Sequence, residues 1–422
     1  MFGWEFPPFF AGGVGTVCYE LTKQLAEDGV EVQYVMPFCP DNLNPEFLKI
    51  YNASKNAPNI KLSKSIKVTK VNSILSAYQT EKEYKETLEK LTFKSSTLGN
   101  NKNNTSKLYG EDMFLEIELF AKRVEKMFLD GLFDDFDVIH AHDWTTIPAA
   151  LVLKKLSGKP LAVHVHITEF NKTGNNTANP DIYKIEKEGF EKSDKVIAIS
   201  NLIKETVKQY GISENKIEII HNGGIKMNPR KDADKIWLMG ENYSETAKVV
   251  MFAGRITGMK GPLRFVDMAN LVLKQQPDTY FVMAGTGDQL NQCIEKAKEL
   301  KIDNKFHFFG FYTREEAEKL YDLADVFVLP SQLEPFGVTP LEAMIKKTPV
   351  VLSKQSGVAE VVKHVLINDF WDVEKMASNV VSLLAYPLLH KTIKEEAFKE
   401  AEKIDWKKPA KECENLYERM LS

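Results

Sequence analysis

Short apolar segments alternate with longer amphipathic segments along most of the chain, which is the pattern of parallel βα units. An N-terminal series predicts strands at 30–37, 137–142, 161–167, 195–200 and 216–222. A C-terminal series predicts strands at 248–254, 279–285, 305–310, 325–330 and 349–353. The segment 406–422 has a helical pattern. The expected fold class is therefore α/β, with two doubly wound sheets.

Two polar stretches interrupt this alternation. Residues 223–246 are polar and are punctuated by three Gly and one Pro, which predicts an interdomain linker. Residues 94–107 have little apolar content and are expected to form a surface loop. We therefore expect two domains that face each other across a cleft. Ligands of such sheets bind beyond the carboxyl ends of the strands, so polar residues at strand ends are the candidates for function.

Glycines precede the first expected helix. Gly12, Gly13 and Gly15 lie ahead of a segment whose apolar face contains Val14, Cys18, Leu21 and Leu25. Glycines let the backbone approach a ligand closely, and free N–H groups at a helix start attract an anion. A dinucleotide fingerprint is disfavoured, because the spacing is G-G-x-G and the strand at 30–37 ends without an acid. A plain tight turn is the remaining alternative.

The C-terminal series carries cations and acids beyond its strands. Arg255 directly follows a strand, and Lys260 lies five residues later in a glycine-rich loop. Both are suited to phosphate oxygens, although a solvated loop with two stray charges would look the same. Thr339, Pro340 and Glu342 form the pattern of a capping box at a helix start. That pattern leaves Glu334, on the loop after the strand at 325–330, without a local role.

Polar side chains also end two strands of the N-terminal series. His142 and Asp143 end one strand, and His164, His166 and Glu169 end another. A lone strand histidine is usually a hydrogen-bonded core residue, but this group would line a cleft. Strand alternation directs His164 and His166 to the same side, so one of the two can have a structural role.

Composition excludes several classes of protein. The 422 residues suffice for two or three domains, and 43% hydrophobic with 27% charged residues is ordinary for a globular chain. A net charge of -4 argues against a nucleic-acid surface. No apolar run is long enough for a membrane span and no cleavable leader opens the chain, although peripheral contact with a membrane stays open.

The cysteines and histidines argue against a metal. The four cysteines lie far apart without paired spacing, which predicts reduced core residues and a cytoplasmic protein. With 8 histidines and no His-x-x-x-His helix, we expect no metal held by side chains.

The set WEFPPFFAGGVG, HAHDW, HVHITEF, AGRITGMKG and EPFGVTPLE, in this order and spacing, resembles the retaining, nucleotide-sugar-dependent glycosyltransferases of family 4 (glycosyltransferase group 1). The match spans residue 1 to about residue 420 and leans toward the glycogen-synthase-like branch. The resemblance implies a GT-B fold. Residues 1–225 would form an acceptor domain and residues 226–404 a nucleotide-sugar donor domain. Residues 405–422 would form a helix that crosses back to the acceptor domain.

The resemblance also implies residue roles. Arg255 and Lys260 would hold the donor diphosphate, Glu334 the sugar hydroxyls and Glu342 the ribose hydroxyls. His166 would lie at the reacting sugar, with Asp143 in the same catalytic group. The remaining donor contacts would come from the glycine turn near the phosphates and from a backbone segment near the sugar, namely Gly12, Gly13, Gly15, Phe336, Gly337, Val338 and Thr339.

The residues also depart from the family pattern. Only Met1 to Gly3 precede the W-E-x-P-P element, where the family has a longer first strand. Either the chain start is assigned too late or the central strand is truncated. The glycine turn lacks the lysine of bacterial starch and glycogen synthases, which weakens an ADP-glucose assignment. In many relatives an acid stands at the position of Ile225.

The expected function is the retaining transfer of a hexose, with glucose expected, from UDP- or ADP-glucose to a glucan or another carbohydrate. No cofactor besides this substrate is expected. The alternatives are a nucleotide-sugar epimerase of the same fold and a non-catalytic sugar-binding module.

Overall fold

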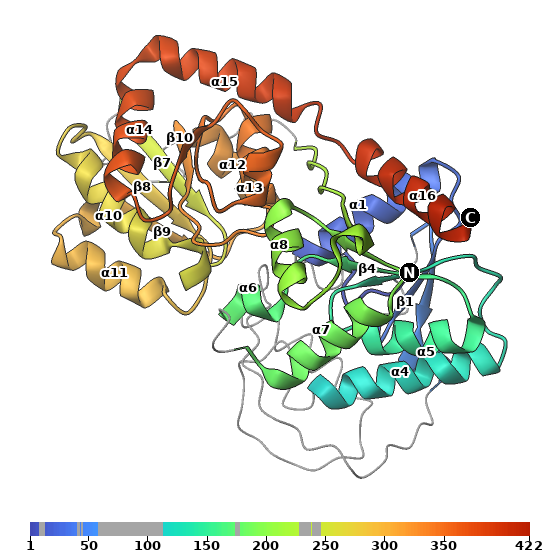
Figure 1. Ribbon diagram of the computed structural model, residues 1–422. Coiled ribbons are helices and arrows are strands. Elements are labelled where there is room, and N and C mark those ends of the chain that lie inside the picture. The colour runs from blue at the N-terminus through green and yellow to red at the C-terminus, as the bar shows by residue number, and fades with distance from the viewer. Residues whose placement is uncertain are drawn as a thin grey trace. The chain divides into compact units, whose positions relative to one another are not determined.

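The computed structural model describes residues 1–7, 13–39, 43, 45–57, 113–173, 178–227, 238 and 246–422 (Figure 1). The chain divides into two compact units. Unit 1 comprises Met1–Ala198, Ile203–Ile220 and Lys407–Ser422, and unit 2 comprises Ile199–Leu202 and His221–Trp406. The loop expected at 94–107 and most of the linker expected at 223–246 lie outside the described residues. How the two domains face each other stays a prediction.

Unit 2 is built on a six-stranded parallel sheet in the order β12-β11-β10-β7-β8-β9. Its strands are β7 (Lys248–Ala253), β8 (Thr279–Ala284), β9 (Phe306–Gly310), β10 (Val326–Leu329), β11 (Val350–Ser353) and β12 (Leu366–Asn368). Its helices are α10 (Pro262–Leu273), α11 (Leu290–Glu299), α12 (Arg314–Leu323), α13 (Val338–Ile345), α14 (Val373–Ala385) and α15 (Pro387–Ala401). The five strands expected in this series are confirmed, and β12 is additional. The strand order reverses between β7 and β10, so this order is the doubly wound one and its switch point lies there.

The core of unit 2 explains why these strands are nearly continuous apolar runs. A parallel sheet is buried on both faces by its crossover helices. Phe252, Phe265 and Phe281 are fully buried between the sheet and α10, and α10 packs beside α11 and α14. The helix α12 begins with a capping box in which the Thr313 hydroxyl accepts from the Glu316 N–H.

Unit 1 contains the parallel strand series β3-β4-β5-β6 and the parallel pair β1-β2. Its strands are β1 (Gln33–Met36), β2 (Lys49–Asn52), β3 (Ile139–His142), β4 (Leu161–Val165), β5 (Lys195–Ala198) and β6 (Ile217–Ile219). Its helices are α1 (Gly13–Glu27), α2 (Ala53–Asn56), α4 (Met113–Leu129), α5 (Ile147–Ser157), α6 (Glu169–Thr173), α7 (Pro180–Lys192) and α16 (Lys407–Leu421), while α8 (Asn201–Gln209) begins in unit 2. The five expected strands are confirmed, and β2 is additional.

Segments from opposite ends of the chain meet in unit 1. Helix α16, drawn in red, packs beside helix α1, drawn in blue (Figure 1). The apolar face of α1 is buried at Cys18, Leu21 and Leu25, and that of α16 at Cys413 and Leu416. All four cysteines are free and buried, as expected from their spacing.

The central strand of unit 1 is very short. Phe2 forms single-residue bridges with Val35 of β1 and Ala141 of β3. The Val35 N–H donates to the Met1 carbonyl at 2.8 Å, and the His142 N–H donates to the Phe2 carbonyl at 3.1 Å. Residues Met1 to Gly3 therefore join the two sheets of unit 1 as one centre strand.

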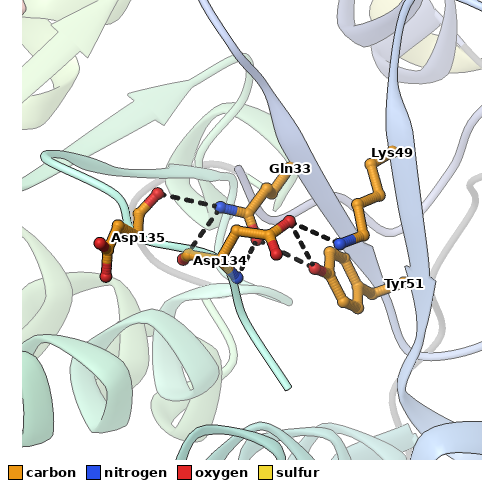
Figure 2. A network of polar contacts seen from close by, with 5 residues as sticks. All are labelled: Gln33, Lys49, Tyr51, Asp134 and Asp135. Atoms are coloured by element: carbon orange, nitrogen blue, oxygen red, sulfur yellow. Dashed lines mark hydrogen bonds and ion pairs between the residues drawn. The ribbon is translucent and has the colours of Figure 1, made fainter. Parts of the chain in front are cut away.

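Side chains provide a second link between these sheets (Figure 2). The Gln33 amide donates to the carbonyls of Asp134 and Asp135 at 3.1 and 3.3 Å. Lys49 pairs with the Asp134 carboxylate at 2.5 Å, and the Tyr51 hydroxyl donates to Gln33 Oε1 at 3.1 Å. Because the Lys49–Asp134 pair is largely exposed to solvent, it contributes little stability.

A hollow of about 580 Å³ lies between β1 and β3, next to Met1. It is lined by the segments that lead into these strands, including Val30, Val32, Phe136 and Val138. At its inner end the Met1 amino group donates to the Gln33 carbonyl at 2.6 Å, and burial lowers the pKa of this amine to about 5. The hollow lies beside the first residue of the centre strand, between the segments that lead into its two neighbours.

We therefore expect four apolar residues added before Met1 to raise the melting temperature by several degrees. They would pair with both neighbouring strands and bury apolar side chains, for a gain of roughly 1–2 kcal/mol in a domain of this size. The control is an addition of equal length made of Gly and Asp, which cannot fill the hollow. Equal melting temperatures for the two extended chains would contradict the prediction.

None of the helices within the described ranges has the length and apolar character needed to span a lipid bilayer.

Candidate active site

The switch point of unit 2 brings together residues that follow β7 and β10. In a doubly wound sheet, ligands bind beyond the carboxyl ends of the strands at this point. Arg255 follows β7 and is half-buried, and Glu334 follows β10 and is buried. The Gln332 N–H donates to the Met259 carbonyl at 2.8 Å, which fastens the loop after β10 to the turn after β7. The loop after β7, which carries Arg255, and the loop after β10, which carries Glu334, therefore lie against each other.

Lys260 ends a short 3-10 helix, Gly258–Lys260, immediately before α10. The following Gly261 has a φ of 67°, in the left-handed region. A Cβ at Gly261 would lie 2.1 Å from the Pro330 carbonyl oxygen. Only glycine therefore allows the Lys260 turn to pack against the end of β10.

Lys260 and Glu334 form an ion pair in unit 2, with side-chain exposures of 16% and 7%. The Glu334 N–H donates to the Gln355 carbonyl at 2.8 Å, and its own carbonyl accepts from Gly357 at 2.9 Å. The acid is thus fixed by backbone bonds on both sides. The family resemblance assigned Lys260 to the donor diphosphate and Glu334 to the sugar hydroxyls. In this structure the two side chains are in direct contact.

The prediction of a capping box at Thr339 and Glu342 is wrong. Helix α13 begins at Val338, its N-cap is Gly337 with a φ of 99°, and no side chain caps it. Because the left-handed turn at Gly337 starts the helix early, Thr339 and Pro340 lie within its first turn. The Glu342 carboxylate instead accepts from the Tyr321 hydroxyl at 2.9 Å, and burial raises the pKa of Glu342.

The start of α13 is the remaining part of this site. Phe336 is buried, and its carbonyl accepts from the Val358 N–H at 2.7 Å, which positions the segment before the helix. The first N–H groups of a helix have no intrahelical partner and point toward the N-terminal end. The α13 start therefore offers the backbone donors of Val338 and Thr339 next to the Glu334 loop.

Sequence reasoning missed a second glycine turn in unit 2. Gly285 follows β8 with a φ of 136°, and a Cβ there would lie 1.8 Å from the Gly254 carbonyl oxygen. Gly254, directly before Arg255, has a φ of 143°. The ends of β7 and β8 can approach each other because residue 285 is glycine, while the positive φ of residue 254 favours glycine there as well. The repeated strand-then-glycine pattern in the sequence could have indicated this pair.

In unit 1, the N-terminal glycines lie differently from the expectation. Gly13 is the first residue of α1, and Gly15 is buried in its first turn. These two glycines are therefore part of the helix and do not precede it. Gly12 lies outside the described residues.

Four imidazoles gather on one face of β3 and β4. The rings of His164 and His166 stack with centroids 4.5 Å apart, and those of His142 and His166 lie 5.2 Å apart. His140, which sequence reasoning did not single out, stacks on His142 at 4.6 Å. Its spacing of two residues from His142 was the available signal, because alternate strand residues share a face. Burial lowers the pKa of all four rings, so they are neutral near pH 7.

Asp143 holds the end of β4 in place. Its Oδ1 accepts from the His166 N–H at 2.7 Å and lies 3.4 Å from the Ile167 nitrogen. Asp143 adopts a φ of 56°, which is uncommon for a residue other than glycine. The carboxylate therefore positions the His166 backbone.

Glu169 begins α6, where it meets a second acid that sequence reasoning missed. The Glu169 N–H donates to Glu186 Oε1 at 2.9 Å, and the Asn179 N–H donates to Glu169 Oε1 at 3.1 Å. The Tyr210 hydroxyl donates to the other oxygen of Glu186. Burial raises the pKa of Glu186 to about 8. Glu186 therefore keeps its proton to a higher pH than an exposed glutamate and belongs to the packing of unit 1.

Glu186 predicts a pH-dependent stability. Its folded pKa of about 8 lies above the ordinary value of 4.5, so the unfolded chain releases this proton first as pH rises. The contribution of Glu186 to the free energy of unfolding should therefore fall between about pH 4.5 and pH 8. The four buried histidines, whose pKa values lie below the ordinary 6.5, act in the opposite direction at lower pH, so the fall should be visible above pH 6.5. Each pKa unit corresponds to ~1.4 kcal/mol, so the effect amounts to a few kcal/mol.

Thermal melts from pH 5 to pH 9 test this prediction. Glu186→Gln should flatten the fall in melting temperature. Glu188→Gln, which changes a partly exposed acid on the same helix that pairs with Lys192, is the control and should keep the wild-type slope. Parallel pH curves for wild type and Glu186→Gln would exclude Glu186 as the cause.

Comparison with solved structures identifies the class of fold. The structure superposes on sucrose-phosphate synthase from Thermosynechococcus elongatus with a TM-score of 0.72 at 17% identity, covering 99% of this chain and 98% of that chain. It also superposes on the catalytic domain of starch synthase IV from Arabidopsis thaliana, with a TM-score of 0.66 at 14% identity, covering 100% and 98% of the chains. With its two Rossmann-like units, the protein has the GT-B glycosyltransferase fold.

Sequence comparison identifies the family. Residues 1–218 match the starch synthase catalytic domain, and residues 238–400 match glycosyl transferases group 1. An uncharacterised glycosyltransferase of Methanocaldococcus jannaschii is 32% identical over 299 residues, covering 67% of this chain and 75% of the relative. Glycogen synthase of Mycobacterium tuberculosis is 26% identical over 367 residues, covering 86% and 79%. The chain belongs to the glycosyltransferases of group 1 and carries the starch synthase catalytic domain.

Proposed function

We propose that this glycosyltransferase transfers a hexose, with glucose the first candidate, from a nucleotide-diphosphate sugar to a glucan or another carbohydrate acceptor. The observation that carries the proposal is the Lys260–Glu334 pair, which lies at the switch point of unit 2 beside the start of α13. A cation, an acid and helix-terminal amides are the groups that bind a phosphate next to a sugar. The proposal needs no cofactor besides this substrate.

Ligands bound to proteins of the same fold support the proposed donor classes. One structural relative, HepE of Anabaena, was solved with UDP and glucose, and starch synthase IV was solved with ADP and acarbose. These ligands support UDP- and ADP-sugars as the donors to test first. Experiments must determine the nucleotide base and the sugar of this protein's donor, and the identity of its acceptor.

The Lys260–Glu334 ion pair suggests which contacts change when the nucleotide-sugar donor binds. We propose that Lys260 breaks its ion pair with Glu334 when the donor binds and pairs with the diphosphate instead. Arg255 adds a second, planar donor for phosphate oxygens. Glu334, released from Lys260, can then accept from sugar hydroxyls, since a carboxylate has lone pairs for two neighbouring hydroxyls. Glu342, held by Tyr321 in this structure, is proposed to accept from the ribose hydroxyls.

We propose a same-face substitution with retention. The acceptor oxygen forms a bond to the anomeric carbon while the bond from that carbon to the leaving phosphate breaks. The acceptor proton passes to the leaving phosphate oxygen, whose charge Arg255 and Lys260 stabilise. His166, positioned by Asp143, is assigned to the reacting sugar. The Glu169 carboxylate accepts from the Asn179 N–H in unit 1, which supports a packing role over that of a nucleophile.

A donor panel tests the proposal. The chain is incubated with UDP-glucose or ADP-glucose, and melting temperature and nucleotide release are measured with and without a soluble glucan. A productive donor at 100 times its Kd should stabilise the chain by about 2.7 kcal/mol and release nucleotide only with acceptor. Conversion of donor without acceptor would favour an epimerase. Binding without any turnover across acceptors would favour a sugar-binding module.

A further inference from the structure

The geometry points to a site for one divalent transition-metal ion, Zn²⁺ or Co²⁺, in unit 1, with His140, His142 and His164 as its ligands. One ring nitrogen from each of these buried residues lies within 4.8 Å of the other two. None of the three has a role in the proposed transfer reaction. The proposal does not rest on the proposed function, although His142 contacts His166, which is assigned to the reacting sugar.

The sheet register brings the three imidazoles together. His142 of β3 lies directly opposite His164 of β4, and His140 shares the face of His142. The ring centroids of His140 and His164 are 5.2 Å apart, as are those of His142 and His164. The ligands therefore stand on two adjacent, buried strands, and rigid elements of this kind position a metal ligand well.

The hydrogen bonds among the four imidazoles leave three buried ring nitrogens without a partner in the described part of the chain, and two of these belong to the proposed ligands. His142 Nδ1 lies 2.9 Å from His166 Nε2, and His164 Nδ1 lies 3.1 Å from His140 Nε2. In the described part of the chain, His142 Nε2 and His164 Nε2 are buried and have no hydrogen-bond partner. If the Nδ1 atoms of both residues carry the protons, both Nε2 atoms present bare lone pairs. A buried polar atom without a partner is destabilising, and a bound cation would offset that loss.

The third ligand already has an outer partner. His140 Nδ1 lies 2.7 Å from the Tyr417 hydroxyl of α16, which is itself packed in unit 1. Metal-bound histidines usually bond through their other nitrogen to such a group, which fixes the ring orientation. His140 Nε2 would exchange its contact with His164 for the ion.

The chemistry of the three ligand nitrogens determines which metal ions would bind. Three neutral imidazoles suit Zn²⁺, Co²⁺, Ni²⁺ or Cu²⁺, whereas Mg²⁺ and Ca²⁺ prefer oxygen ligands. Zinc–nitrogen bonds of ~2.0–2.1 Å place tetrahedral ligand nitrogens roughly 3.4 Å apart, so the rings would close inward by about 1–1.5 Å. Such an ion would join β3 to β4 and, through Tyr417, to α16.

The test uses the untagged full chain, stripped with a chelator, because a histidine tag would bind the same ions. Equilibrium dialysis against Zn²⁺ should give one ion per chain, and Co²⁺ should give visible absorption bands of a nitrogen-ligated ion. His142→Gln and His164→Gln should each lower the affinity by roughly 100-fold or more, since each removes a ligand. Tyr417→Phe should keep the stoichiometry and lower the affinity by about 10- to 100-fold, as loss of an outer partner does.

His307→Gln, which changes a histidine of β9 in unit 2, is the matched control and should bind zinc as wild type does. Circular dichroism shows which variants fold. No uptake by the wild-type chain would overturn the proposal, because the imidazoles would then be a hydrogen-bonded stack only. Undiminished uptake by a folded His142→Gln/His164→Gln double variant would overturn it as well. If neither ligand variant folds, the wild-type stoichiometry and the Tyr417→Phe affinity decide: unchanged affinity in Tyr417→Phe then counts against the site.

Discussion

Lys260→Ala and Arg255→Ala are each expected to lower kcat/KM by roughly 10- to 100-fold or more. Hydrogen bonds to a charged group contribute about 1.5–3 kcal/mol each, and ~1.4 kcal/mol corresponds to a factor of ten. Both cations are proposed to act on the phosphate that departs, so the loss should affect kcat as well as KM. Initial rates over a range of donor concentrations measure both constants. Near-normal activity in the double variant would exclude these residues as the diphosphate clamp.

The ion pair makes the two variants differ in stability. Lys260→Ala leaves the buried Glu334 carboxylate without its cation, so the chain should lose stability. The loss should be smaller than the roughly 3–5 kcal/mol found when a fully buried pair is broken, because Lys260 is partly exposed. In the Lys260→Ala/Glu334→Gln chain the melting temperature should recover while activity stays low. Recovery of activity along with stability would mean that Lys260 acts only as a structural partner of Glu334.

Gly261→Ala is expected to destabilise unit 2 and to lower activity together. The new Cβ would clash with the Pro330 carbonyl oxygen at 2.1 Å, at a residue whose φ of 67° favours glycine. Strain of this kind costs about 1–3 kcal/mol, which should lower the melting temperature by several degrees. To relieve the clash, the Lys260 turn must move away from the loop that carries Glu334. We therefore expect at least a tenfold loss of kcat/KM, measured alongside the melting curve.

Gly258→Ala is the matched control for this substitution. Gly258 lies in the same turn, but the nearest atom to a Cβ there is Gln289 Nε2 at 3.6 Å, which is an ordinary contact distance. Its melting temperature and rate should stay close to those of wild type. Similar losses in both variants would show that the turn tolerates no side chain anywhere, and the close approach at Gly261 would not be the cause.

The strand pattern was predictable because parallel strands are buried on both faces. Segments such as 248–253 and 326–329 are nearly continuous apolar runs, and the structure confirms each expected strand. The two additional strands are short: β12 has 3 residues, and β2 has 4 residues that begin with Lys49 and end with Asn52. Such segments become strands through pairing with β11 and β1, which a local pattern does not reveal.

The sequence could predict which site residues follow a strand, but it could not predict which of them are in contact. Arg255, Glu334 and Asp143 follow strands in the sequence, and the structure places them at strand ends. The contact between Lys260 and Glu334 depends on the order of β7 and β10 in the sheet, which the sequence does not state. The capping-box prediction failed because a glycine with positive φ can start a helix earlier than a Thr-Pro pattern indicates. The protonation of Glu186 depends on burial by segments distant in sequence.

The anomeric configuration of the first product tests the proposed retaining transfer most directly. Inversion needs a general base opposite the leaving group, and a double displacement needs a carboxylate at the anomeric carbon. Glu334 and Glu342 are assigned to hydroxyls, Asp143 accepts from the His166 N–H, and Glu169 accepts from the Asn179 N–H. A same-face route without a covalent intermediate therefore fits the described residues best. Proton NMR of the linkage formed first from an α-linked donor should show an α-anomeric coupling, whereas a β-anomeric coupling would contradict the account.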